Sequence, residues 1–256
     1  MAKQFEPNII KVASGDDLAN KAFEIFAQKA KESIKINGIF RVAVSGGHTP
    51  ETFFHLLAEA AADFDWPRIH IFWVDERYVP PTDANSNYHL AETTFLTYVP
   101  IPPENVHRIP TEASDYNFAA EQYELTIRKA FDLKPGQVPE FDLMILGLGS
   151  DGHIGSLFPN EVSAFDTVHL ATVVYIMDDK MIDDKFDRIT LTYPVMRAAR
   201  HLMVLVSGHS KANIVKEVFE SEEPDQVKYP VHSLWPILNK ITWLMDSHAG
   251  KLLKKP

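Results

Sequence analysis

Short, predominantly apolar segments alternate with amphipathic helical segments along most of this chain, and this alternation constrains the fold more than any other feature. The segments that read as strands include IFRVAVS (39–45), RIHIFWVDER (68–77), FDLMILGLG (141–149) and HLMVLVS (201–207). Strands whose apolar run is nearly continuous, rather than alternating with polar residues, are typical of a parallel sheet buried on both faces. We therefore predict an α/β protein with three layers, in which helices cover both faces of a mostly parallel, Rossmann-like central sheet.

Local signals predict the remaining elements. A helix is expected to begin after Ser14, which can cap it, and to end at Asn37-Gly38. Pro50 is expected to open a second helix, because proline suits the first helical turn. Further helices are predicted at 86–97, 115–131 and 211–221, and further strands at 169–177, 188–192 and 241–246. Since no linker rich in Pro, Gly or Ser interrupts this pattern, residues 1–256 are predicted to form a single domain.

Composition limits the classes of function. The 256 residues include no cysteine, which excludes disulfides, a thiolate nucleophile and cysteine metal sites. The formal net charge of -10 at pH 7 argues against a nucleic-acid partner. No apolar stretch approaches the roughly 20 residues that cross a bilayer, and the N-terminus lacks the layout of a secretory signal. We expect a cytoplasmic protein that binds neither membrane nor nucleic acid.

Polar, chemically reactive sequences follow four of the predicted strands. They are SGGHTP (45–50), DERYVPPTDANSNY (75–88), GLGSDGH (147–153) and SGHSK (207–211). In open α/β sheets, ligands bind at the carboxyl ends of the strands, where loops and helix N-termini converge. The four sequences are therefore predicted to line one ligand site.

One of these sequences contains a G-x-G-x-x-G pattern (147–152), the spelling of a dinucleotide-binding turn. Such a turn needs a sustained helix after its last glycine, but Pro159 leaves room for about two turns at most. The carboxylate of Asp151 would also lie beside the negatively charged pyrophosphate, which is unfavourable. We therefore expect no nicotinamide or flavin cofactor. The glycines are expected to allow a tight turn that leaves Asp151 and His153 near the site.

Taken together, these motifs resemble the signatures of the 6-phosphogluconolactonase family. The matching runs are L-G-x-G-x-D-G-H-x-x-S-L-F-P (146–159), DERYVPPTDANSNY (75–88), Ser45-Gly46-Gly47 with Thr49-Pro50, RITLT (188–192), G-x-x-K (208–211) and WLMDSHAG (243–250). The resemblance extends from about residue 40 to 250. It implies a fold of the NagB/RpiA/CoA transferase-like type. It also implies hydrolysis of 6-phospho-D-glucono-1,5-lactone to 6-phospho-D-gluconate, the second step of the oxidative pentose phosphate pathway, with no cofactor and no required metal.

Two alternatives remain open. Glucosamine-6-phosphate deaminases share the fold and a similar G-x-D-G-H turn, but favour D-E-Y where this chain has Asp75-Glu76-Arg77 and an F-N-E-P-like run where it has SLFP (156–159). In a deaminase, Asp75 would be the base. The other alternative is a non-catalytic sugar-phosphate sensor, which would normally carry a DNA-binding segment with a basic face, and none is evident.

The resemblance assigns catalytic roles to three residues. His153 would be the general base, because an ordinary imidazole pKa of about 6.5 lets it take and return a proton near neutrality. Asp151 would orient that imidazole or merely hydrogen-bond the turn. Asp75 would bind sugar hydroxyls or a catalytic water, or would instead hold Arg77.

The phosphate of the implied substrate needs N–H donors and positive charge. Ser45, Gly46 and Gly47, ahead of a helix N-terminus, are the predicted phosphate loop, although an ordinary Gly-Gly turn would look the same. Predicted cations are Arg77, Arg188 and Lys211, each of which could instead form a surface ion pair. Arg77 could also stabilise the oxyanion formed from the lactone carbonyl.

Other residues near these motifs receive simpler expectations. Asn85, Ser86 and Asn87 are expected to organise their loop by local hydrogen bonds, with direct contact to the substrate as the alternative. Phe158 is expected to belong to the core. The sequence leaves open the oligomeric state, the role of His48, the role of the acidic segment 178–187 and any adventitious metal binding.

Overall fold

A computed structural model describes residues 6–176 and 186–254, apart from the side chain of His48. Seven parallel strands form the central sheet in the order β1-β10-β9-β6-β2-β3-β5. Their bounds are β1 (Asn8–Val12), β2 (Phe40–Val44), β3 (Ile69–Trp73), β5 (Val106–His107), β6 (Leu143–Gly147), β9 (Leu202–Val206) and β10 (Ile241–Asp246).

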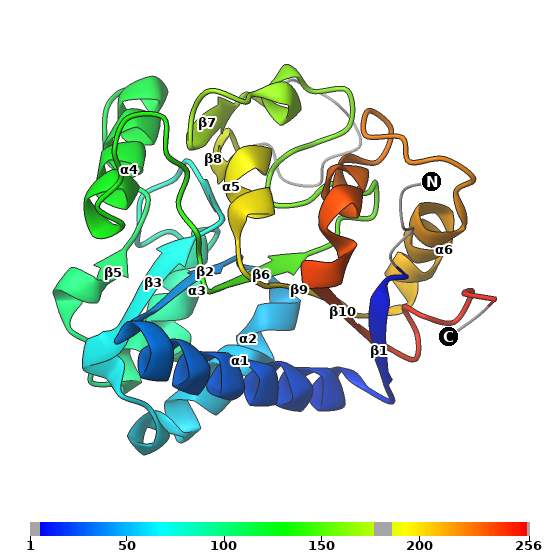
Figure 1. The fold of residues 1–256 in the computed structure, drawn as a ribbon, viewed down its shortest axis with the longest axis horizontal. Coiled ribbons are helices and arrows are strands. Elements are labelled where there is room, and N and C mark those ends of the chain that lie inside the picture. The colour runs from blue at the N-terminus through cyan, green and yellow to red at the C-terminus, as the bar shows by residue number, and fades with distance from the viewer. Residues whose placement is uncertain (1–5, 177–185, 255–256) are drawn as a thin grey trace.

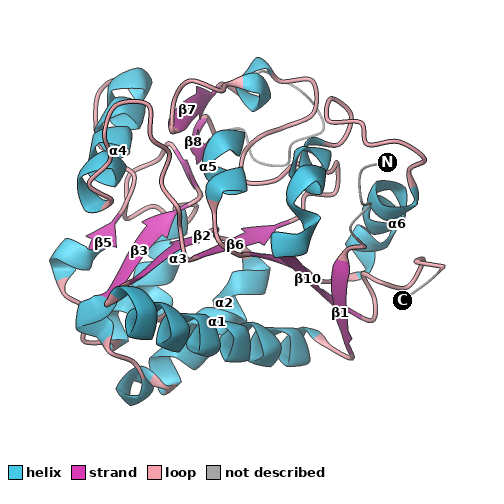
Figure 2. Cartoon of the chain, viewed as in Figure 1, coloured by secondary structure: helices cyan, strands magenta, loops and turns pink. Residues whose placement is uncertain are grey.

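Helices cover both faces of this sheet, which confirms the predicted α/β, three-layer class. Figure 1 shows α1 (Gly15–Asn37) and α2 (His48–Glu59) on one side, with α4 (Tyr116–Ala130) and α5 (Tyr193–Ala198) on the other. The strands run between these two layers (Figure 2). Helix α3 (Asn87–Thr94) packs against α2, and α6 (Ala212–Glu220) follows β9. Among the described helices, none is long and apolar enough to cross a membrane.

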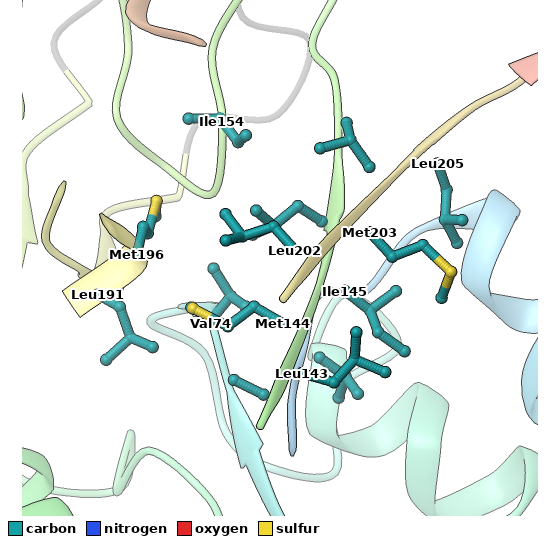
Figure 3. Packing of buried hydrophobic residues seen from close by; sticks show 14 of the residues in the cluster. Val74, Leu143, Met144, Ile145, Ile154, Leu191, Met196, Leu202, Met203 and Leu205 are labelled. Carbon is teal, nitrogen blue, oxygen red and sulfur yellow. The ribbon is translucent and has the colours of Figure 1, made fainter. Parts of the chain in front are cut away.

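Strands β6 and β9 are buried on both faces, which explains why their sequences are apolar throughout. Neighbouring side chains of a strand point to opposite sides of the sheet. Figure 3 shows Met144 and Leu202 on the side of Val74, whereas Ile145 and Met203 point the other way. All five side chains are at most 1% exposed. Full burial of a side chain of this kind contributes roughly 1.5–3 kcal/mol to folding, so both layers stabilise these central strands.

A second, antiparallel sheet is the main departure from the predicted arrangement. It contains β4 (Asp75–Arg77), β8 (Arg188–Leu191) and β7 (Ala171–Val174), in the order β4-β8-β7. The predicted strand 68–77 was therefore wrong as one element. At Val74 the chain changes partner: its N–H donates to the carbonyl of Val44 in the central sheet, and its carbonyl accepts from Leu191 in the second sheet. The apolar run hides this change, because both sheets bury it.

Capping residues set the helix limits. Ser14 caps α1 by accepting a hydrogen bond from the N–H of Asp17, and Gly38 ends the helix with a φ of 75°. Helix α2 begins at His48, two residues earlier than predicted, with Pro50 still in its first turn. Strands β1 and β5 and helix α5 were not predicted. A two-residue strand such as β5 has no periodicity to detect, and its pairing depends on β3.

Candidate active site

A cavity of about 460 Å³ opens at the carboxyl ends of β2, β6 and β9. All the residues that the sequence proposed for the site line it: Ser45, Gly46, Gly47, Asp75, Arg77, Asp151, His153, Arg188 and Lys211. They come from loops after three strands of the central sheet and from two strands of the second sheet. The cavity lining therefore combines residues that lie far apart in the chain.

Asp151 and His153 contact each other directly in the turn after β6. One oxygen of Asp151, Oδ1, lies 2.7 Å from Nδ1 of His153 and accepts the backbone N–H of His153 at 3.1 Å. Burial acts to raise the pKa of Asp151, but its hydrogen bonds to His153 and the charge of that ring together act more strongly, so the pKa lies below its ordinary value. An ionised carboxylate can only accept a hydrogen bond, so the Nδ1–H of His153 donates to Asp151 and Nε2 is left as the nitrogen that can exchange a proton.

Two glycines make this turn possible. A Cβ on Gly149 would lie 2.2 Å from Nδ1 of His153 and 2.6 Å from Oδ1 of Asp151. Gly152 has a φ of 87°, a conformation that side chains with a Cβ rarely adopt. The element that follows is a short 3-10 turn, Val162–Phe165, and not a sustained helix. The glycines thus permit the tight turn that holds His153. They are not followed by the sustained helix that a dinucleotide-binding turn requires.

The predicted phosphate loop joins β2 to the N-terminus of α2. Ser45 is buried, and its hydroxyl has no hydrogen-bond partner among the residues that the structure describes. Gly46 packs so closely on Asn87 that a Cβ would lie 2.0 Å from the side-chain oxygen Oδ1. Gly47 caps α2 with a φ of 104°, and Thr49 in the first turn also lines the cavity. The loop therefore brings a spare hydroxyl and the positive end of a helix to the cavity.

Lys211 reaches the cavity from the loop after β9. Its burial lowers the pKa, although the charge of Asp151 acts in the opposite direction. Within the described residues, its ammonium group makes no hydrogen bond or ion pair. Asp246, at the end of β10, anchors this loop: its Oδ2 accepts from Oγ of Ser207 at 2.6 Å and from N of Gly208 at 2.9 Å. Sequence reasoning missed Asp246, although it lies within the WLMDSHAG motif.

Asp75 pairs with Arg188 and Ser156 rather than with Arg77. The Oγ of Ser156 donates to Oδ2 of Asp75 at 2.6 Å, and Nη1 of Arg188 lies 4.0 Å from the same oxygen. Both charged side chains are buried, each with an exposed fraction of 8%. The idea that Asp75 holds Arg77 therefore does not match the geometry. Ser156 was not singled out from the sequence, although it stands in the family-like SLFP run.

The side chain of Asn87 makes hydrogen bonds outside its own loop, which differs from the predicted role. Its Oδ1 accepts from Nη1 of Arg77 at 3.0 Å, and its Nδ2 donates to the carbonyl of Asp75 at 2.8 Å. It lines the cavity and joins two strand residues, so the purely local role was wrong for Asn87. Asn85 does make the expected local contacts, with two hydrogen bonds of 2.8 Å to Oδ1 of Asp83.

Phe158 is buried as predicted but also lines the cavity. Its ring centroid lies 4.6 Å from that of His153, and the guanidinium of Arg188 lies 5.5 Å from its centroid. It therefore supplies an apolar wall beside the imidazole. The side chain of His48 and residues 178–185 of the acidic segment lie outside the described residues. No group of three or more His, Asp or Glu in the described part is placed to hold a metal ion.

Comparison with known proteins gives consistent likenesses over most of the chain. A family model described as glucosamine-6-phosphate isomerases/6-phosphogluconolactonase matches residues 13–243. A 6-phosphogluconolactonase of Synechocystis sp. is 34% identical over 252 residues, covering 97% of this chain and 99% of that protein. A 6-phosphogluconolactonase of Nostoc sp. is 35% identical over 233 residues, covering 91% of this chain and 92% of that protein.

Solved structures agree. The 6-phosphogluconolactonase from Thermotoga maritima is 28% identical, with a TM-score of 0.78 and coverage of 94% of this chain and 100% of that one. The 6-phosphogluconolactonase from Leishmania guyanensis is 26% identical, with a TM-score of 0.86 and coverage of 98% and 100%. A monomeric glucosamine-6-phosphate deaminase is 20% identical with a TM-score of 0.79, covering 96% and 100%, which concerns the fold alone.

Proposed function

Because this chain belongs to the family of glucosamine-6-phosphate isomerases and 6-phosphogluconolactonases, we propose that it hydrolyses 6-phospho-D-glucono-1,5-lactone to 6-phospho-D-gluconate in the oxidative pentose phosphate pathway. The observation that carries this function is the presence of the His153–Asp151 pair in the same cavity as the 45–47 loop and Lys211. Hydrolysis of a phosphorylated lactone needs a base at one end of the substrate and an anion site at the other.

The pair supports general-base hydrolysis. Nε2 of His153 removes a proton from a water molecule as its oxygen attacks the lactone carbonyl carbon. The tetrahedral oxyanion then collapses, and the bond between that carbon and the ring oxygen breaks. The imidazolium returns its proton to the departing ring oxygen, which becomes a hydroxyl group. Asp151 stabilises the imidazolium between these steps, because its carboxylate accepts the hydrogen bond from Nδ1.

The charge of the cavity suits an anionic substrate. Among the described residues that line it are the cations Arg77, Arg188 and Lys211 and the carboxylates Asp75 and Asp151, so the lining is locally positive although the chain carries -10. The phosphate is assigned to the 45–47 loop, the N-terminus of α2 and Lys211. Hydrogen bonds to charged groups contribute about 1.5–3 kcal/mol each, so two or three of them hold a sugar phosphate. The arginines are assigned to the same substrate.

The test is an assay with freshly prepared lactone, followed by pH-stat or by a coupled dehydrogenase and corrected for spontaneous hydrolysis. We expect turnover well above the spontaneous rate and no ammonia release from glucosamine 6-phosphate. Lactone hydrolysis at the spontaneous rate would contradict the proposal, and ammonia release would favour a deaminase with Asp75 as its base. The proposed working unit is the single domain of residues 1–256, acting in the cytoplasm on a small sugar phosphate without a nucleic-acid partner.

A further inference from the structure

Glu76 is a buried carboxylate beside the cavity, but it is not one of the residues that line it. Its side chain belongs to β4, between Asp75 and Arg77, and is 2% exposed. Oε1 accepts from the N–H groups of Arg77 at 2.8 Å and Asn87 at 2.7 Å. Oε2 accepts from Oγ of Ser86 at 2.9 Å and from the N–H of Tyr88 at 2.8 Å. One carboxylate thus binds both ends of the loop between β4 and α3.

This arrangement does more than cap a helix. Ser86 already caps α3, because its Oγ accepts from the N–H of His89 at 3.1 Å. Glu76 in addition accepts the N–H of Arg77, which belongs to the same strand, and the N–H of Asn87, which is the first residue of α3. Burial raises the pKa of Glu76 above its ordinary value, although the four hydrogen-bond donors act in the opposite direction. An acceptor-only group suits this position, since every neighbour that bonds to it is a donor.

The backbone position of Asn87 matters because its side chain touches three parts of the cavity lining. It accepts from the guanidinium of Arg77, donates to the carbonyl of Asp75, and packs against Gly46 of the predicted phosphate loop. A shift of Asn87 would therefore move Arg77 and the 45–47 loop relative to each other. The His153–Asp151 pair stands on a different turn, after β6, and does not depend on this contact.

We propose that Glu76 is a positioning residue: its carboxylate fixes Asn87, and through Asn87 it sets Arg77 and the 45–47 loop at the spacing that the anionic substrate requires. The inference rests on the proposed function. In Glu76→Gln, the amide nitrogen replaces one acceptor oxygen and faces N–H and O–H donors, so hydrogen bonds at that oxygen are lost. The expected result is weaker substrate binding with an unchanged pH profile of kcat, since the base is untouched.

A double-mutant cycle tests this mechanism. Glu76→Gln and Asn87→Ala are each expected to raise KM, and the dissociation constant of 6-phosphogluconate, by about tenfold. The double variant should remain near tenfold, because both changes break the same connection. Combination of Glu76→Gln with Lys211→Ala, which lies on another loop, should instead multiply the two effects. Multiplicative effects of Glu76→Gln and Asn87→Ala, or a wild-type KM in Glu76→Gln, would overturn the proposal.

A matched control separates positioning from stability. Asp115→Ala removes the cap of α4, where Oδ1 of Asp115 accepts from the N–H of Phe118 at 2.8 Å, away from the residues that line the cavity. It should lower Tm and leave KM unchanged. Equal KM changes in both variants at equal loss of Tm would mean that Glu76 only stabilises the fold. If Glu76→Gln does not fold, Ser86→Ala, which removes one of the four donors, should raise KM by a smaller factor, and an unchanged KM would contradict the proposal.

Binding of 6-phosphogluconate is measured by calorimetry, independently of turnover. A wild-type protein that binds this product but does not hydrolyse the lactone would contradict the proposed function. The cycle could still be read from the binding constants alone, so failure of the function and failure of the Glu76 inference remain distinguishable.

Discussion

One oxygen of Asp151 receives both the backbone N–H and the ring Nδ1 of His153, at 3.1 Å and 2.7 Å. This double contact sets the rotation of the imidazole and also its tautomer, because an ionised carboxylate can only accept. The ring edge that carries Nε2 is then the one able to act on a substrate in the cavity. Phe158 lies against the ring and adds an apolar wall.

Removal of the imidazole should abolish most of the catalysis without removing the anion site. We expect His153→Ala to lower kcat by about 10²–10⁴, with the dissociation constant of 6-phosphogluconate nearly unchanged. Stopped-time lactone assays and calorimetry measure the two quantities. His169→Ala is the matched control, since His169 is exposed and pairs with Asp166 outside the residues that line the cavity. Near-normal kcat in His153→Ala would remove His153 from the role of base.

Neutralisation of Asp151 should change the pH dependence of stability as well as the rate. The pKa of Asp151 is lowered in the folded protein, so between that pKa and the ordinary value near 3.9 the unfolded chain binds more protons. Its contribution to the free energy of unfolding is therefore present above this range and is lost as the pH falls through it.

For Asp151→Asn we accordingly expect lower stability than wild type at neutral pH, with the difference shrinking in acid. Urea unfolding at a series of pH values measures this difference. The kcat should also fall, because an asparagine amide stabilises the imidazolium less well than a carboxylate. A stability difference that stays constant between neutral and acidic pH would contradict the ionised pair.

Loss of the Lys211 ammonium should mainly weaken binding of phosphorylated ligands. A charge-assisted hydrogen bond of about 1.5–3 kcal/mol corresponds to a loss of roughly 10- to 150-fold in affinity. Lys211→Ala should raise the dissociation constant of 6-phosphogluconate within this range, while unphosphorylated gluconolactone is turned over as by the wild type. Lys216→Ala, an exposed lysine on the following helix, is the control. Unchanged product inhibition in Lys211→Ala would exclude the phosphate role.

Addition of a single methyl group to the turn after β6 tests whether this turn holds His153 in its catalytic position. In Gly149→Ala the new Cβ would fall 2.2 Å from Nδ1 of His153, so the ring must move. A displacement of about 1 Å can cost 10²-fold in rate, and we expect a fall in kcat of that order. In Gly147→Ala no atom of the described residues lies within 4 Å of the added Cβ, so most of the activity should remain. Equal kcat values for the two variants would show that the turn does not hold the base.

The sequence was enough to predict the fold class and nine of the residues that line the cavity, but not that Asn87 and Phe158 also line it. Hydrophobic periodicity and capping depend on neighbours within a few positions, as at Ser14 and Gly38 of α1. The rule that ligands gather at the carboxyl ends of parallel strands then brought His153 and Lys211 together without any knowledge of the strand order.

Tertiary structure alone decided the partners of the charged groups. Asp75 and Ser156 are 81 residues apart, and their contact depends on how β4 and the loop after β6 pack. The change of sheet at Val74 could not be predicted either, because an apolar residue is equally suited to both sheets. The sequence shows that residue 76 is a glutamate, but it does not show whether the carboxylate faces water, the substrate or four N–H and O–H donors. Its role is set by distances across the fold, since hydrogen bonds and ion pairs act over a few ångströms in space and not along the chain.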